Sequence, residues 1–178
     1  MNLSNHFLVS IPDKSKNFNS CDVIYISQHQ ELNGTIGVII NKPTGIILKK
    51  AFKDVNFENY NPKWGDNNLF YGGPVSTNYG FFLQPHIIHD NKSLYRLSNS
   101  KKALDSMSNA NSDLFVALGY FLWNREQLLN ELYGNWLVVK AVKDLIFDVD
   151  PNHRYNEALK LLGIKQSGYL IYEKSSPI

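Results

Sequence analysis

Polar residues and glycines gather where two buried β-type runs end, and these residues are the best suited to binding or chemistry. Asn41 and Lys42 close one run. Gly72 and Gly73 close another. Consecutive glycines permit positive φ angles and the close approach of a partner, and backbone N–H groups in such a turn can bind an anion. Together with His29, at the end of the run that precedes Asn41, they predict a small polar cleft that holds a ligand.

The same pattern is also typical of tight turns without a function, because glycine, asparagine and proline all favour turn conformations. If the cleft exists, it belongs either to a regulatory or binding module or to a hydrolase-type enzyme. In the enzyme, His29 is the general base and the glycine N–H groups stabilise an anion. Because no nucleophile or second titratable group is evident beside His29, the non-enzymatic binding module is the favoured interpretation. Replacing Gly73 with valine is then expected to abolish binding while harming folding only modestly.

Three other groups of residues could do chemistry but have simpler explanations. His86 and His89 are three residues apart, a spacing that faces one side of a helix, yet the extended pattern after Pro85 would point them to opposite faces. The acidic segment 148–153 reads better as a helix start than as a metal site. Cys21 lies beside an aspartate that raises its pKa, so it is a poor nucleophile. We therefore expect no metal and no cofactor.

Composition narrows the class of protein. The 178 residues fit a single domain over 1–178, and 43% hydrophobic with 19% charged residues is typical of a globular chain. A net charge of +2, with scattered lysines, makes a nucleic-acid-binding regulator the weaker alternative. The sequence shows no membrane span and no signal peptide, so we expect a cytoplasmic protein. Its partner, a protein or small molecule, is not identified by the sequence, and an exposed edge strand leaves a homo-oligomer open.

Strand and helix signals mix along the chain. The β-branched runs 23–26 and 35–40, joined by a turn at 33–34, predict a hairpin of buried strands. Further strands are expected at 6–11, 69–71, 81–83, 114–120, 136–139 and 170–172. Since hairpins dominate the first half, the expected class is α+β rather than a doubly wound parallel sheet.

The helices have recognisable ends. Apolar spacing predicts one over 47–55, and Ser98 or Ser100 can cap another that buries 103, 104 and 107. Asn124 with Gln127 forms a capping box, and Gly134 ends that helix. A last helix is expected to begin at 150–151 and to stop at Gly163, burying 158, 161 and 162.

Taken in order, these segments resemble the AlgH/YqgE family of bacterial proteins over nearly the whole chain. The matching segments are 6–12, 23–26 with His29, 34–43, 71–75 with 80–81, 118–120, Trp123, 127–128, 131–132, 135–137, 145–147 and 158–164. The resemblance implies an α+β domain whose bifurcated β-sheet folds into a pseudo-barrel with flanking helices. It implies no established reaction, cofactor or catalytic residue, and its transcriptional-regulator label carries no mechanism. The chain departs from the family in the bulky segment 121–126 and at Leu129, where an acidic residue is common.

Overall fold

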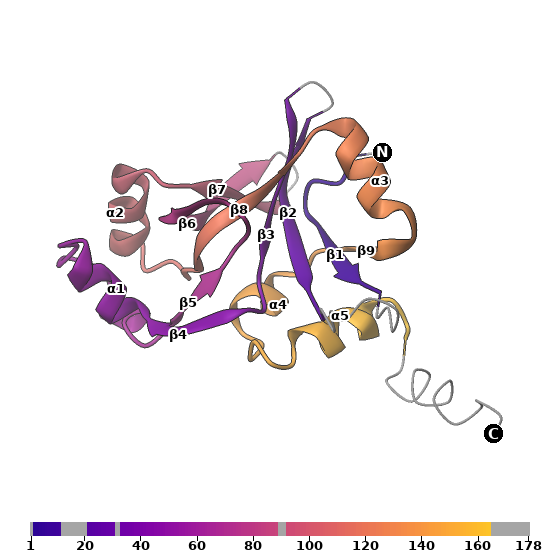
Figure 1. The fold of residues 1–178 in the computed structure, drawn as a ribbon. Helices are drawn as coiled ribbons and strands as arrows, with labels where there is room; N and C mark the ends of the chain where they lie inside the picture. The colour runs from indigo at the N-terminus through magenta and orange to yellow at the C-terminus, as the bar shows by residue number, and fades with distance from the viewer. Residues whose placement is uncertain (1, 12–20, 31–32, 89–91, 165–178) are drawn as a thin grey trace.

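The computed structural model describes residues 2–11, 21–30, 33–88 and 92–164, which form a mixed sheet flanked by helices (Figure 1). The strands are β1 (His6–Ser10), β2 (Val23–Gln30), β3 (Gly34–Ile39), β4 (Pro43–Ile47), β5 (Asn68–Tyr71), β6 (Val75–Ile88), β7 (Lys92–Ser98), β8 (Val116–Trp123) and β9 (Trp136–Lys140). The helices are α1 (Leu48–Asp54), α2 (Lys101–Asn109), α3 (Arg125–Asn135), α4 (Lys143–Phe147) and α5 (Arg154–Leu161), with a 3-10 turn over Pro62–Trp64. The class is α+β, as the sequence predicts.

The sheet is open and branches at β8. Its main path runs β4-β5-β8-β3-β2-β1-β9, while β6 leaves the path, pairing with both β8 and β7. β8 pairs in parallel with β5 and antiparallel with β3 and β6. The terminal strands β4 and β9 lie at opposite ends of this path, so the expected pseudo-barrel is wrong: among the described strands the sheet does not close. Because β8 has three neighbouring strands, the sheet divides there into two arms and does not close into a cylinder.

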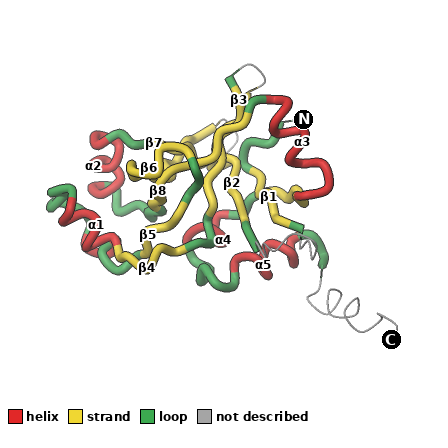
Figure 2. The backbone as a smooth tube through the Cα atoms, in the orientation of Figure 1, coloured by secondary structure: helices red, strands yellow, loops and turns green. Residues whose placement is uncertain are grey.

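The central strands β1, β2 and β3 are buried on both faces. Alternate residues enter different cores: Phe7, Val9 and Tyr25 pack on one side, while Leu8 and Ile24 pack on the other. A strand sends successive side chains to opposite faces, so a continuous apolar run indicates helices on both sides. α4 and α5 cover the first face and α3 the second, and Figure 2 shows the helices around the strands.

α1 and α2 lie together at the end of the molecule formed by β5, β6 and β8. Their apolar side chains share a third core, which includes Leu48, Phe52, Trp64 and Met107. Ser100 caps α2 by accepting a hydrogen bond from Ala103 N at 3.4 Å, as expected. Helices therefore cover the sheet in two regions: α3, α4 and α5 lie around the central hairpin, and α1 and α2 lie at the other end (Figure 1).

Several elements differ from the sequence-based predictions. β4, β7 and α4 were not expected, because their short segments lack a clear apolar period. α5 begins at Arg154, after a turn that contains Pro151, and Leu161 is 43% exposed instead of buried. The predicted strand at 170–172 and His89 lie outside the described residues. No helix in the described part of the chain is long and apolar enough to cross a bilayer.

Candidate ligand-binding site

His29 lies near the turn that joins β2 to β3, in register with Thr35. Its Nδ1 is 2.8 Å from Thr35 Oγ1, and its backbone N–H donates to Ser4 Oγ at 2.9 Å. Thr35 is only 2% exposed, and its hydroxyl fixes the imidazole ring from within the hairpin. The histidine is thereby held at the end of a rigid hairpin.

The hairpin and α3 enclose a cavity of about 260 Å³, called here the hairpin pocket. Its lining is mostly apolar with a few polar groups: Leu3, His29, Gln30, Gly34, Thr35, Arg125, Leu128, Leu129, Leu132, Trp136 and Val138. Pockets that bind small molecules commonly combine an apolar wall with a few polar groups that orient the ligand. The cationic Arg125 and the imidazole of His29 supply those groups here.

α3 is fixed against the hairpin at its first turn. The Asn124 side chain accepts from Gln127 N at 2.8 Å, and Gln127 Oε1 accepts from Asn124 N at 3.0 Å, which confirms the capping box. Trp123 and Leu128, on either side of the cap, share one core. Since a capping box sets where a helix begins, it also sets where Arg125 stands over the pocket.

α3 exposes two large apolar side chains. Leu129 is 57% exposed and Tyr133 is 90% exposed, and they stand four residues apart, on one side of the helix. Leu129 also lines the hairpin pocket. The helix ends as predicted, because Gly134 adopts a φ of 78°. The pocket therefore continues outward into an apolar strip.

Asn41 and Lys42 lie at the opposite end of the hairpin. Asn41 Oδ1 accepts from Val23 N at 2.9 Å, and its Nδ2 donates to the Cys21 carbonyl at 2.6 Å. Lys42 Nζ is 2.7 Å from Asp22 Oδ1 and 2.9 Å from Oδ2. These side chains tie the end of β3 to the beginning of β2.

Gly72 and Gly73 use their small size to pack, and Gly72 lies beside the end of β3. The Gly72 N–H donates to the Leu118 carbonyl, and its own carbonyl accepts from Ile39 N at 2.9 Å. A Cβ at Gly73 would lie 2.3 Å from the Tyr120 carbonyl carbon. The expectation that valine at Gly73 harms folding only modestly is therefore wrong, because backbone atoms fill the space. The Gly72 N–H is also already engaged.

The five residues of the predicted cleft thus fall into two groups. Asn41, Lys42, Gly72 and Gly73 stand at one end of β3, and His29 stands at the other. His29 lies six positions along β2 from Val23, the partner of Asn41, which is about 20 Å at 3.3 Å per residue. The hairpin pocket is lined by His29 alone of the five. The cation of the hairpin pocket is Arg125, which the sequence did not single out, and not Lys42.

A buried arginine fixes the other end of the hairpin. Arg154 is 4% exposed, donates through Nη1 to the Ile40 carbonyl and through Nε to Val149 O at 2.9 Å, and stacks 5.0 Å from the Phe70 ring centre. Burial lowers the pKa of Arg154 to about 10, so it is still charged at neutral pH. It joins α5 to the strand end that carries Asn41, a contact that the sequence does not signal.

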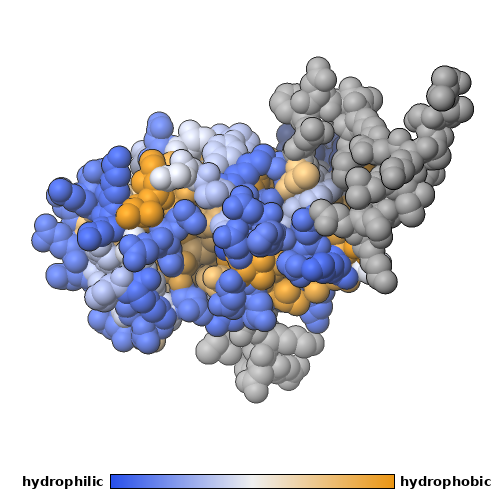
Figure 3. Space-filling view, turned by 90° about the horizontal axis from the view of Figure 1, so that it is seen from below, coloured by the Kyte–Doolittle hydropathy of each residue, from blue (hydrophilic) through white to orange (hydrophobic). Residues whose placement is uncertain are grey.

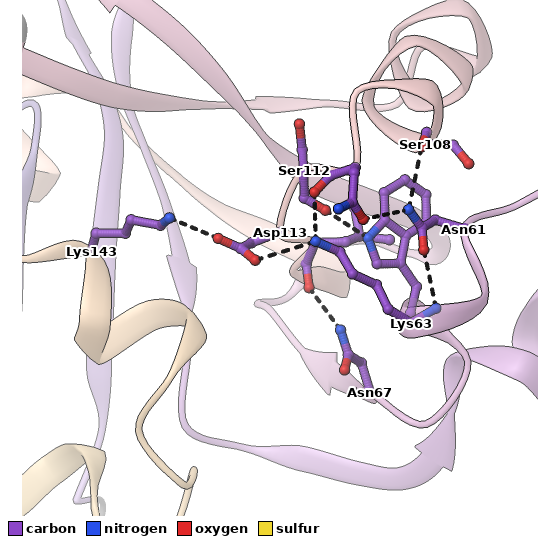
Figure 4. A network of polar contacts seen from close by, with 10 residues as sticks. Asn61, Lys63, Asn67, Ser108, Ser112, Asp113 and Lys143 are labelled. Carbon is purple, nitrogen blue, oxygen red and sulfur yellow. Dashed lines mark hydrogen bonds and ion pairs between the residues drawn. The ribbon is translucent and has the colours of Figure 1, made fainter.

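A second polar cluster joins three distant segments (Figure 4). Lys143 from α4 lies 2.7 Å from the Asp113 carboxylate, and Lys63 lies 3.7 Å from it on another side. Trp64 Nε1 donates to Ser112 O at 2.8 Å. All of these contacts link the 3-10 turn and α4 to the segment before β8, so we interpret the cluster as a structural clamp.

The clamp predicts a small, pH-dependent contribution to stability. Asp113→Asn should lower the free energy of unfolding by at most about 1 kcal/mol at neutral pH, because half-exposed ion pairs are screened. The hydrogen bond from Lys143 lowers the pKa of Asp113 below 3.8. A carboxyl whose folded pKa is depressed stabilises above its unfolded pKa and loses that effect as pH falls through the folded value. The wild-type and variant urea curves should therefore converge below about pH 4; a gap that persists at the lowest pH would contradict the clamp.

Metal ligation finds no support in the described part of the chain, where no three histidine, cysteine or acidic side chains cluster. His86 lies in β6, but the other members of its predicted group, at 89 and 90, lie outside the described residues. Cys21 is exposed, and burial of part of its thiol, followed by the charge of Asp22, raises its pKa.

Comparison with known proteins gives one consistent family. A family model described as AlgH-like matches residues 7–167. UPF0301 proteins of Variovorax paradoxus and Neisseria gonorrhoeae are 37% and 35% identical, covering 93% and 92% of this chain and 91% and 93% of theirs. The solved AlgH protein of Pseudomonas aeruginosa is 26% identical with a TM-score of 0.72, over 100% of this chain and 97% of that one. A Corynebacterium diphtheriae protein, 18% identical with a TM-score of 0.67 over 89% and 86%, shares the fold.

Proposed function

The chain belongs to the AlgH-like family, and from that premise we propose that it is a non-enzymatic binding module that captures its ligand in the hairpin pocket. The observation that carries the proposal is that His29 and Arg125 both line a cavity of about 260 Å³ whose other lining residues are mostly apolar. The ligand that fits has an apolar body and an anionic or hydrogen-bond-accepting end. That end faces Arg125, and the body lies against Leu132 and Trp136.

Binding is favoured over catalysis by the surroundings of His29. A hydrolase that works through a covalent intermediate needs a nucleophilic side chain that both contacts its base and meets the substrate. The one hydroxyl among the described lining residues belongs to Thr35, which contacts His29 but is buried. Arg125 cannot act as a base, since its guanidinium stays charged. The guanidinium of Arg125 and the imidazole of His29 therefore suit the recognition of a ligand.

The apolar strip of Leu129 and Tyr133 supports a regulatory role. Exposed apolar surface beside a pocket is typical of an interaction surface. A ligand in the pocket contacts Leu129 from below, so its presence can change how α3 meets a partner. In this proposal a small molecule binds in the pocket, and the contact between α3 and a partner changes in response.

Thermal unfolding against a panel of nucleotides, divalent metals, small carboxylates and short RNA tests the proposal. A ligand at about 100 times its dissociation constant stabilises the fold by about 2.7 kcal/mol. For a domain of this size we expect an increase in Tm of roughly 5–10 °C. The increase should disappear in Arg125→Ala and His29→Ala. It should persist in Asn130→Ala, a change on α3 at a residue outside the pocket lining.

Three results would contradict the proposal. A panel in which no compound changes Tm would exclude small-molecule capture among the tested classes. Hydrolysis of p-nitrophenyl acetate by the wild type but not by His29→Ala would instead establish the enzymatic alternative. A stabilising compound that still acts on both pocket variants would place the site elsewhere.

A further inference from the structure

A second cavity lies between α1 and α2, far from His29 in the fold. It has a volume of about 350 Å³ and is lined by Leu48, Ala51, Phe52, Val55, Asn56, Phe57, Leu69, Asn78, Gly80, Phe82, Asn99, Lys101, Leu104, Val116 and Leu118. None of these residues lines the hairpin pocket. We call it the α1–α2 pocket.

The wall of the α1–α2 pocket is mainly apolar, with Asn56, Asn78, Asn99 and Lys101 as its polar members. Leu48, Phe52, Phe82 and Val116 are each less than 9% exposed and belong to one core, so the pocket is a gap in that core. The apolar part of the wall suits an apolar guest, because it offers water no hydrogen-bonding partners. Val55, which is 71% exposed, stands where the cavity meets solvent.

Gly80 leaves the space open. A Cβ at Gly80 would meet a single atom within 4 Å, Val116 Cγ1 at 3.9 Å. The φ angle of Gly80 is not positive, unlike that of Gly73 or Gly119, so the backbone does not require glycine there. Asn78 and Phe82, two residues away on either side, line the same pocket. A larger residue at 80 would therefore find room beside the cavity that Gly80 lines.

The charge at the mouth is positive. Lys101 is the one charged residue among the described lining residues, and no carboxylate in the described ranges pairs with it. The two helices that flank the pocket carry five lysines and two aspartates, over 48–54 and 101–109. At this end of the molecule, Figure 3 shows an apolar patch bordered by strongly hydrophilic residues.

From this arrangement we propose that the α1–α2 pocket binds a single-chain fatty carboxylate. The alkyl tail occupies the cavity between Phe52 and Phe82, and the carboxylate meets the ammonium of Lys101. The amide side chains of Asn78 and Asn99 stand within the same lining and can donate to the second carboxylate oxygen. A fatty carboxylate suits the site because its tail needs an apolar cavity and its one charged end needs a cation with hydrogen-bond donors beside it. The site is independent of the hairpin pocket and of its proposed function.

Isothermal titration of the full chain with hexanoate, octanoate and decanoate, each below its micelle concentration, tests the proposal. Each methylene buried contributes about 0.8 kcal/mol, so affinity should rise about fourfold per methylene until the tail fills the cavity. Octylammonium, which has the same tail and the opposite charge, should not bind. Equal affinity across the carboxylates, or equal binding of octylammonium, would overturn the proposal.

Two variants and a matched control locate the site. Gly80→Leu should weaken decanoate binding by more than about tenfold, because its side chain occupies the cavity. Lys101→Gln should weaken it about tenfold by removing a charged hydrogen-bond donor. Lys102→Gln, the next residue on the same exposed turn but outside the lining, should leave it unchanged. Lys101 is exposed and begins α2, where a cation is not favoured by the helix dipole, so its loss does not threaten folding.

The outcomes separate this proposal from the previous one. Loss of decanoate binding in Arg125→Ala would assign the carboxylate to the hairpin pocket and overturn the α1–α2 site. Equal affinities of Lys101→Gln and Lys102→Gln would overturn it as well, even if Gly80→Leu failed to fold. If no compound raised the Tm by binding in the hairpin pocket, a rise of carboxylate affinity with chain length would still support the α1–α2 site.

Discussion

Gly72→Ala should lower the free energy of unfolding by about 4 kcal/mol, a large fraction of the stability of an ordinary domain. The added Cβ would lie 2.3 Å from the Gly119 carbonyl oxygen and 2.8 Å from both the Ala117 Cβ and the Val38 Cγ2. The clash cannot be relieved by a side-chain rotation, since the nearest atom is backbone. Moving Gly72 away would also break its hydrogen bonds with Leu118 and Ile39, which join three strands.

Gly80→Ala is the matched control for this change. Both glycines contact β8, but a Cβ at Gly80 has its nearest neighbour at 3.9 Å. We expect the free energy of unfolding of Gly80→Ala to lie within about 0.5 kcal/mol of the wild-type value. Urea unfolding followed by circular dichroism measures both. If Gly72→Ala unfolded at the same urea concentration as the control, the tight contact between β5 and β8 would not exist as described.

Arg154→Ala should cost about 3–5 kcal/mol in the free energy of unfolding. Hydrogen bonds from a charged donor contribute about 1.5–3 kcal/mol each, and Arg154 makes two, to the carbonyls of Ile40 and Val149. Its removal also leaves a cavity over Phe70 and buried carbonyls without their donor. Release of a buried charge offsets part of this cost.

Two further variants separate those contributions. Arg154→Met retains apolar volume over Phe70 and removes the charge, so it should lose roughly half as much as alanine. Lys160 lies on the same helix and forms an exposed ion pair with Glu157. Lys160→Ala should lower the free energy of unfolding by less than about 0.5 kcal/mol. Denaturant unfolding of the three proteins ranks them. A loss below about 1 kcal/mol in Arg154→Ala would show that α5 is not held by its guanidinium.

Sequence alone determined the features that depend on near neighbours in the chain. The β2–β3 hairpin, the capping box at Asn124 and Gln127, the cap at Ser100 and the positive φ of Gly134 were all predicted correctly. Each of these depends on contacts within a few residues, whose preferences are strong enough to act alone. The ordered set of such segments also identified the family. Weak local signals failed at β4, β7 and α4, where tertiary pairing overrides propensity.

Tertiary structure decided which functional groups meet. His29 and Lys42 both end strands, yet the hairpin places them at opposite ends, because an antiparallel pair sets the end of one strand beside the start of the next. Arg125 joins His29 only because α3 packs across the hairpin, and Asp113 joins Lys63 and Lys143 across 80 residues of chain. Whether a sheet closes depends on all its strand pairs together, and the three neighbours of β8 keep this one open. Such contacts are sums of many weak, distant interactions, and no short segment of the sequence encodes them.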